Sequence, residues 1–281
     1  MAVRIITDSA ADLDLTEARR LQVDVVPMSI QFGAKTFVTG ETITNDTFYR
    51  MLQERQENPS TSQPTPAAFL GLFEDAKAAG DEVVVILISS KLSGTVQSAA
   101  VAKGMCGYDP IYIVDSLNAT AGMQLLVNYA CTLRSSGLSA AVIADQVELL
   151  LDKVRIFAVI DTLEYLRRGG RLSGFQAGLG AVTRLKPTIT VRDGLVVIAG
   201  KSFGMAAAVK QMQKFLDEHP IDGDFPAYFL YSDSRAVEGL LLPRLEEQGK
   251  LPQQLRYCQV GPAIGTHVGP GALGMAYIER D

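Results

Sequence analysis

The sequence has no tryptophan, only two histidines and only three cysteines among its 281 residues. Two histidines, His219 and His267, are too few for a metal site built mainly from imidazoles. The cysteines, Cys106, Cys131 and Cys258, are odd in number and lack the spacing of metal ligands. We expect them to be buried reduced thiols, because free cysteine behaves as a small apolar residue. No metal site is predicted, although magnesium binding by carboxylates alone stays open.

Basic clusters and long apolar runs are also missing. The formal net charge is -5, and no group of lysines and arginines offers a surface for the phosphate backbone. Nucleic acid is therefore not expected as a partner. Residues 1–8 end in an acidic residue and contain no apolar core of a signal peptide. No later apolar run is long enough to span a bilayer. We expect a cytoplasmic protein with at most transient membrane contact.

Strand-like and helix-like segments alternate along the chain, which predicts an α/β fold. The expected strands are residues 3–6, 23–32, 83–88, 111–114, 156–160, 189–191 and 227–231. The expected helices are residues 67–79, 119–134, 140–154 and 205–218.

The chain is longer than one compact core usually is, so we predict two α/β domains, residues 1–154 and 155–281. The first should contain a mostly parallel sheet flanked by helices. The second should contain a mixed sheet, because Asp193-Gly194 between two apolar runs predicts a hairpin and hence antiparallel pairing.

Several expected strands end in short polar runs, such as Thr7-Asp8-Ser9, Ser89-Ser90 and Asp161-Thr162. In a parallel sheet these residues fall at the carboxyl ends of the strands, where α/β proteins place their ligand crevice. Aspartate and serine also cap helices. Each run alone fits capping better, whereas the set together favours a ligand edge.

Nucleotide-binding motifs are absent, since Gly194 and Gly200-Lys201-Ser202 have five residues between the glycines where a P-loop has four. Gly200 to Gly204 does match the Gly-x-Ser-x-Gly elbow of serine hydrolases, with Ser202 as nucleophile. Asp233 and His267 follow in the order of a catalytic triad. Against this alternative, the strand before Ser202 is the return arm of a hairpin, whereas the elbow needs a central parallel strand.

The strongest local pattern is residues 89–100, where a strand end leads through hydroxyls and a glycine into a helix. A helix N-terminus attracts an anion, and the hydroxyls of Ser93 and Thr95 can add donors. An oxyanion or carboxylate could bind there. Ordinary helix capping by serine or threonine is the alternative.

Near the C-terminus, residues 261–274 crowd glycines and prolines around His267. Such a segment without disorder-like composition suggests backbone held close to another group. His267 could donate a hydrogen bond to an acid group there, or it could be a structural histidine in a tight turn.

Five segments in order resemble the DegV family of fatty-acid-binding proteins. They are residues 7–13, 60–66, 93–95, 161–171 and the loop around His267, so the resemblance covers almost the whole chain. It implies a two-domain α/β fold, one acyl chain buried in the N-terminal domain, and its carboxylate at the domain interface. It further implies a carrier subunit that hands the carboxylate to a fatty acid kinase, which makes acyl phosphate for phospholipid synthesis.

Carried over by motif, Thr61, Ser93 and His267 would bind the carboxylate, and Thr95 and Arg171 would contact the head group or a partner. The resemblance implies no catalytic residue and no cofactor beyond the bound fatty acid. One departure concerns the kinase: residues 202–208 contain no basic side chain where family members often have several. A fatty-acid-sensing regulator with the same pocket is a further alternative, and acyl length and oligomeric state stay open.

Overall fold

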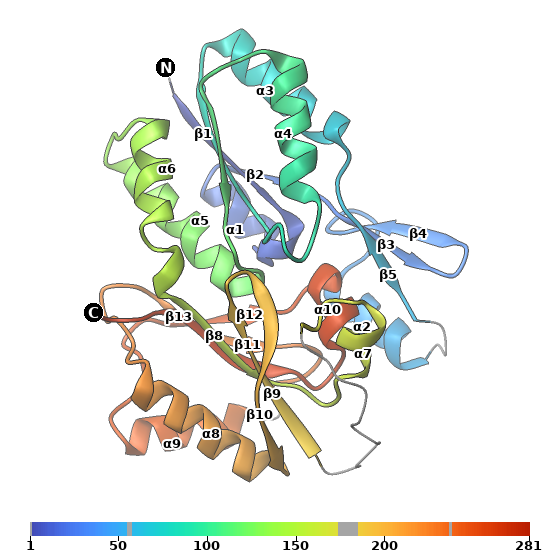
Figure 1. Ribbon diagram of the computed structural model, residues 1–281, viewed down its shortest axis with the longest axis vertical. Helices are drawn as coiled ribbons and strands as arrows, with labels where there is room; N and C mark the ends of the chain where they lie inside the picture. The colour runs from blue at the N-terminus through green and yellow to red at the C-terminus, as the bar shows by residue number, and fades with distance from the viewer. Residues whose placement is uncertain (1, 55–57, 174–184, 236–237) are drawn as a thin grey trace.

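The computed structural model describes residues 2–54, 58–173, 185–235 and 238–281. Within these ranges the strands form three sheets with helices between and around them (Figure 1). The first sheet is parallel throughout, in the order β2-β1-β6-β7. Its strands are β1 (Val3–Asp8), β2 (Val23–Val26), β6 (Glu82–Leu87) and β7 (Ile111–Asp115). The predicted parallel sheet is confirmed.

The second sheet is mixed, as predicted, and has the order β10-β9-β8-β13-β11-β12. Its strands are β8 (Val154–Val159), β9 (Leu185–Arg192), β10 (Leu195–Phe203), β11 (Ala227–Tyr231), β12 (Leu255–Gln259) and β13 (Leu273–Ile278). The predicted hairpin joins β9 and β10. Asp193 and Gly194 both have positive φ, 50° and 78°, which is the backbone of a type I′ turn.

A third, small sheet corrects the prediction of a single strand over residues 23–32. It consists of β3 (Ser29–Phe32), β4 (Lys35–Val38) and β5 (Ser60–Ser62), and β3 pairs with the other two in antiparallel fashion. Pro27 separates β2 from β3, and a proline cannot donate to a strand ladder. The chain therefore leaves the parallel sheet there and starts a new one.

Helices cover both faces of each large sheet (Figure 1). On one face of the parallel sheet lie α3 (Pro66–Ala79) and α4 (Thr95–Cys106), and on the other lie α1 (Leu15–Arg20), α5 (Thr120–Ser135) and α6 (Ala140–Glu148). The outer face of the mixed sheet carries α8 (Met205–Glu218) and α9 (Glu238–Glu247). The short helices α2 (Asn45–Glu54), α7 (Glu164–Arg168) and α10 (Pro262–Val268) gather beside β5.

Helix α5 lies between the two large sheets. It contacts β1 and β6 on one side and β8 and β13 on the other, so its apolar residues are buried all round. Leu125 and Leu126 belong to this core. The same cluster includes Ile86 and Ile278, so one core crosses the predicted division at residue 154, and that division stays a prediction.

Helix boundaries follow the sequence closely, with one exception. Thr65 is the N-cap of α3, Pro66 is its first residue, and Gly80 ends it in the left-handed conformation. The helix expected over residues 140–154 is shorter than predicted, because α6 ends at Glu148 and the 3-10 turn η2 (Leu151–Lys153) leads into β8. All three cysteines are buried and free, as predicted.

Candidate functional site

A cavity of about 320 Å3 lies where the N-terminal sheets and helices face α7, β10 and α10. Its volume is in the range of small-molecule sites. We call nine of its side chains the apolar lining: Met28, Ile88, Leu92, Ala119, Leu166, Val196, Ala263, Ile264 and Val268. The other six, which we call the polar lining, are Thr61, Ser62, Gln63, Ser93, Arg171 and His267. Four of the five predicted site residues therefore border one cavity.

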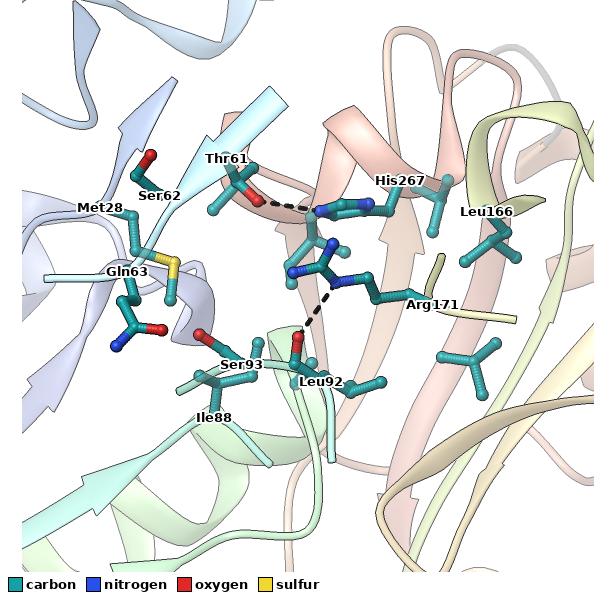
Figure 2. Close-up of a pocket in the computed structure, with 15 residues that line it drawn as sticks. Met28, Thr61, Ser62, Gln63, Ile88, Leu92, Ser93, Leu166, Arg171 and His267 are labelled. Atoms are coloured by element: carbon teal, nitrogen blue, oxygen red, sulfur yellow. Dashed lines mark hydrogen bonds between the residues drawn. The ribbon is translucent and has the colours of Figure 1, made fainter. Parts of the chain in front are cut away.

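Thr61 and His267 meet across this cavity from elements 206 positions apart in the chain. Thr61 is the middle residue of β5, and its Oγ1 lies 3.1 Å from Nε2 of His267 (Figure 2). The sequence suggested a loop around His267, but the residue lies near the end of helix α10. Pro262 starts this helix and Gly269, with φ 74°, ends it, which explains the glycine and proline content.

The His267 imidazole is neutral at physiological pH. Burial, and secondarily the nearby Arg171 cation, lowers the pKa of His267 to about 4. Its second ring nitrogen, Nδ1, is buried and has no hydrogen-bond partner among the described residues. The ring therefore offers one N–H donor and one acceptor and carries no charge.

Arg171 supplies the cation of the polar lining. Its Nε donates to the carbonyl of Leu92 at 3.1 Å (Figure 2), and Nη1 donates to the carbonyl of Gly169 at 2.5 Å. Within the described part of the chain, Nη2 has no hydrogen-bond partner and the guanidinium has no ion pair. The side chain is thus fixed by two carbonyls while its charge is not neutralised by a carboxylate, which suits an anionic ligand.

Ser93 and Thr95 stand at the beginning of α4, and their hydroxyl oxygens are 2.8 Å apart. Neither hydroxyl caps the helix, because the N-cap residue is Gly94 and the first turn has no side-chain cap bond. The capping alternative for these two residues is therefore wrong. Ser93 lines the cavity, whereas Thr95 is fully buried behind it, so only Ser93 is placed to meet a ligand directly.

The polar residues at the strand ends shape the loop that carries Ser93. Asp8 accepts hydrogen bonds from the backbone N–H groups of Ile88 and Ala10 at 2.9 and 2.8 Å. Its burial raises the pKa of Asp8 to about 6. Asp115 accepts a bond from the Ser90 N–H at 3.0 Å. Neither carboxylate borders the cavity, so these acids support the ligand edge from behind.

A second cavity of about 200 Å3 shares Thr61, Arg171 and His267 with the first. Its remaining lining includes Tyr165 and Arg168, whose guanidinium donates to Asn58 and Glu164. The three shared side chains therefore separate a largely apolar cavity from a more polar one.

The hydrolase triad is not assembled. Ser202 lies on β10, the edge strand of the mixed sheet, and its buried hydroxyl has no partner among the described residues. His267 is bonded to Thr61, and the Asp233 carboxylate accepts from the Gly271 N–H at 2.8 Å. No hydrogen bond in the described ranges connects Ser202, Asp233 and His267.

Residues 2–54, 58–173, 185–235 and 238–281 hold no group of three or more histidine, cysteine or acidic side chains suited to a metal ion. None of the helices described there has the length and apolar character needed to cross a membrane.

Sequence reasoning missed several residues around the site. Gln63 donates to the Gly94 carbonyl at 3.1 Å and to the Ser98 hydroxyl at 2.9 Å, which ties the end of β5 to α4. The sequence feature that could have identified Gln63 is its position two residues after Thr61. The apolar lining had no such signal, because its residues come from places spread between Met28 and Val268 and resemble ordinary core residues.

The fold and the cavity define a class: an α/β protein with a parallel and a mixed sheet that encloses a mainly apolar cavity, bordered by a cation that no described acidic residue neutralises. A family model described as an uncharacterised protein of the DegV family matches residues 2–280. The chain belongs to the DegV family, and the resemblance predicted from its motifs is confirmed.

Individual relatives are similar over their full length. A DegV domain-containing protein of Caldanaerobacter subterraneus subsp. tengcongensis is 31% identical over 279 residues, covering 99% of each chain. The solved structure of a fatty-acid-binding DegV family protein from Thermus thermophilus is 31% identical with a TM-score of 0.90 and full coverage of both chains. A stearic-acid-binding protein from Eubacterium ventriosum is 26% identical with a TM-score of 0.87, covering 99% of this chain and 98% of its own.

Proposed function

We propose that this protein binds a long-chain fatty acid, with the acyl chain against the apolar lining and the carboxylate at Thr61, Ser93, His267 and Arg171. One observation carries the proposal: a mainly apolar cavity is bordered by hydroxyls and by a guanidinium that no described carboxylate neutralises. A fatty acid has the matching chemistry, since it combines a long apolar chain with a single negative group.

The comparisons support this ligand class, because the solved relatives from Thermus thermophilus and Eubacterium ventriosum are themselves described as fatty acid and stearic acid binding. The resemblance placed the acyl chain in the N-terminal domain. The lining favours a position between the halves, since Leu166, Val196 and Ala263 come from the C-terminal half.

The energetics divide the ligand into two parts. Burying some fifteen methylenes is worth roughly 12 kcal/mol gross at about 0.8 kcal/mol each. A charge-assisted hydrogen bond at the carboxylate nets about 1.5 to 3 kcal/mol. The acyl chain should therefore set the affinity, whereas the carboxylate contacts should set the orientation.

We further propose that the protein is a carrier without covalent chemistry of its own, which presents the carboxylate to a fatty acid kinase for acyl phosphate formation in phospholipid synthesis. The more polar second cavity supports this reading, because it adjoins three of the four side chains that would hold the carboxylate. Residues 202–208 lack basic side chains, so a kinase would have to dock on another surface. A fatty-acid sensor would use the same cavity without the kinase.

The first experiment is to denature the purified protein, extract it with organic solvent and identify fatty acid by mass spectrometry. Roughly stoichiometric fatty acid supports binding and names the preferred chain. Its absence, together with no uptake of added oleate or palmitate, contradicts the proposal. An esterase assay on wild type and Ser202→Ala runs alongside, and ester turnover that disappears in the variant would favour the hydrolase.

The kinase role needs a separate assay. The loaded protein is mixed with a bacterial fatty acid kinase and ATP, and acyl phosphate is trapped with hydroxylamine. Hydroxamate that depends on both proteins supports the carrier. A loaded protein that yields no hydroxamate with active kinase favours the sensor.

A further inference from the structure

Gly169, in the Gly-Gly-Arg run before the predicted Arg171, contacts two residues of the polar lining, Arg171 and His267. A Cβ built on it would lie 2.8 Å from Cε1 of His267 and still closer to Nδ1, well inside van der Waals contact. Its carbonyl accepts the 2.5 Å bond from Arg171. The position therefore borders the imidazole on one side and holds the guanidinium on the other.

Glycine is needed at this position for space and not for backbone conformation. Gly169 has φ -72° and ψ -10°, which any L-residue adopts. Gly170 is the opposite case, with φ 68° and no atom of the described residues within 4 Å of an added Cβ. The neighbouring glycines thus separate a steric requirement from a conformational one.

The close approach of Gly169 also decides where the His267 proton sits. A neutral imidazole carries one N–H, on either Nδ1 or Nε2. A proton on Nδ1 would be a buried donor without an acceptor among the described residues, pressed against the Gly169 Cα hydrogens. The proton therefore belongs on Nε2, from which it is donated to Thr61 Oγ1 over 3.1 Å.

This tautomer determines what Thr61 can do. A hydroxyl has one proton, and Thr61 Oγ1 already accepts from His267. Its own proton is then free to be donated to another acceptor in the cavity. With the other tautomer, Thr61 would donate its proton to Nε2 and present only lone pairs to a carboxylate.

We propose that Gly169 is a positioning residue, which leaves room for the His267 imidazole, selects its Nε2–H tautomer and so makes the Thr61 hydroxyl a donor to the ligand carboxylate. This inference rests on the proposed fatty-acid binding for its ligand, but the tautomer itself is a property of the protein alone.

The direct test is a long-range 1H–15N NMR spectrum of the histidine rings, recorded on the 15N-labelled full chain at a pH where imidazoles are neutral. The chain has only two histidines, and His219→Gln assigns the signals. His219 is an internal reference of opposite type, because its Nδ1 lies 2.8 Å from a Glu279 carboxylate oxygen and should carry the proton. His267 should show an unprotonated Nδ1. A protonated Nδ1 at His267 would overturn the proposal.

The functional test is a double-mutant cycle on the affinity for palmitate. Gly169→Ala should lower the affinity about tenfold, the size of one lost charge-assisted bond. In a His267→Ala background the same change should cost nothing further, because the imidazole it displaces is gone. An equal loss in both backgrounds would refute the positioning role.

Gly170→Ala is the matched control. It should lower the unfolding temperature through its strained backbone, but leave the affinity and the His267 ring signals as in wild type. An equal loss of palmitate affinity in Gly170→Ala and Gly169→Ala would count against the steric argument. If wild type binds no palmitate, the proposed function fails, whereas the ring spectrum still decides the tautomer.

Discussion

The apolar and polar linings of the cavity differ in how firmly the protein holds them. Thr61, Ser93, Arg171 and His267 each make a hydrogen bond to another protein group, so their orientations are fixed before any ligand arrives. The apolar lining is held by packing alone and includes the adaptable side chain of Met28. The difference suggests a site that is strict about the ligand's head group and tolerant about the shape of its chain.

Filling the apolar space should have the largest effect. Ala263 lines the cavity from α10, and Ala263→Leu adds three carbons there. Displacing about three methylenes at roughly 0.8 kcal/mol each, together with overpacking of about 1 kcal/mol, predicts at least a 100-fold weaker affinity for palmitate. Calorimetric titration measures it.

Ile264→Val is the control for Ala263→Leu, because it changes the next residue of the same helix without narrowing the cavity. It should bind palmitate nearly as well as wild type. Ala263→Leu should also lower the affinity for decanoate less than the affinity for palmitate, since a shorter chain fills less of the cavity. Equal losses for both acids would argue against an acyl chain in this cavity.

Removing the cation is the next largest change. Arg171→Met keeps much of the side-chain volume but loses the charge and the donors, so palmitate affinity should fall by about 1.5 to 3 kcal/mol, roughly tenfold to 100-fold. The affinity for the matching fatty alcohol should change much less, because the alcohol carries no charge. A parallel loss for acid and alcohol would show that Arg171 acts through packing.

Four of the six residues of the polar lining could be predicted because they lie in motifs, whereas the apolar lining could not. Ser93 follows a strand and precedes a helix, which is a local pattern with a physical reason. Ala263 and Val196 resemble core residues, and only the tertiary fold shows that they border a cavity. Pro27 marked a break within residues 23–32, but strand propensity does not say which sheet the second strand joins.

Burial of His267 should make stability depend on pH. Its pKa is lowered to about 4 in the folded state, so the folded protein favours the neutral ring. The neutral His267 ring contributes fully to the free energy of unfolding above the unfolded pKa of about 6.5. This contribution is lost as the pH falls through the folded pKa. Between about pH 7 and pH 5 wild type should lose roughly 2 kcal/mol relative to His267→Gln.

Urea unfolding of both proteins at each pH measures this difference. Asp8 and Asp12, whose burial raises their pKa values to about 6 and about 7, act in the opposite sense, since they bind protons more tightly when folded. Both acids are present in wild type and variant, so their contribution cancels in the comparison. A variant that follows wild type at every pH would place the His267 pKa near its usual value.

The smallest effect on affinity, and the one that most sharpens the contrast between the linings, is expected from Ser93. Ser93→Ala removes one hydroxyl that lines the cavity and bonds only to Thr95 within the described chain, so palmitate affinity should fall by about 1 kcal/mol, several-fold.

If the polar lining sets orientation, phosphoryl transfer to the bound acid should fall further than affinity, because a displaced carboxylate reacts poorly even when the chain is still bound. Palmitate retention and hydroxamate yield, measured on the same preparation with Ser62→Ala as control, give the two numbers. Equal losses in both would mean that the head group and the chain are not handled separately, and the distinction between a strict and a tolerant lining would fall.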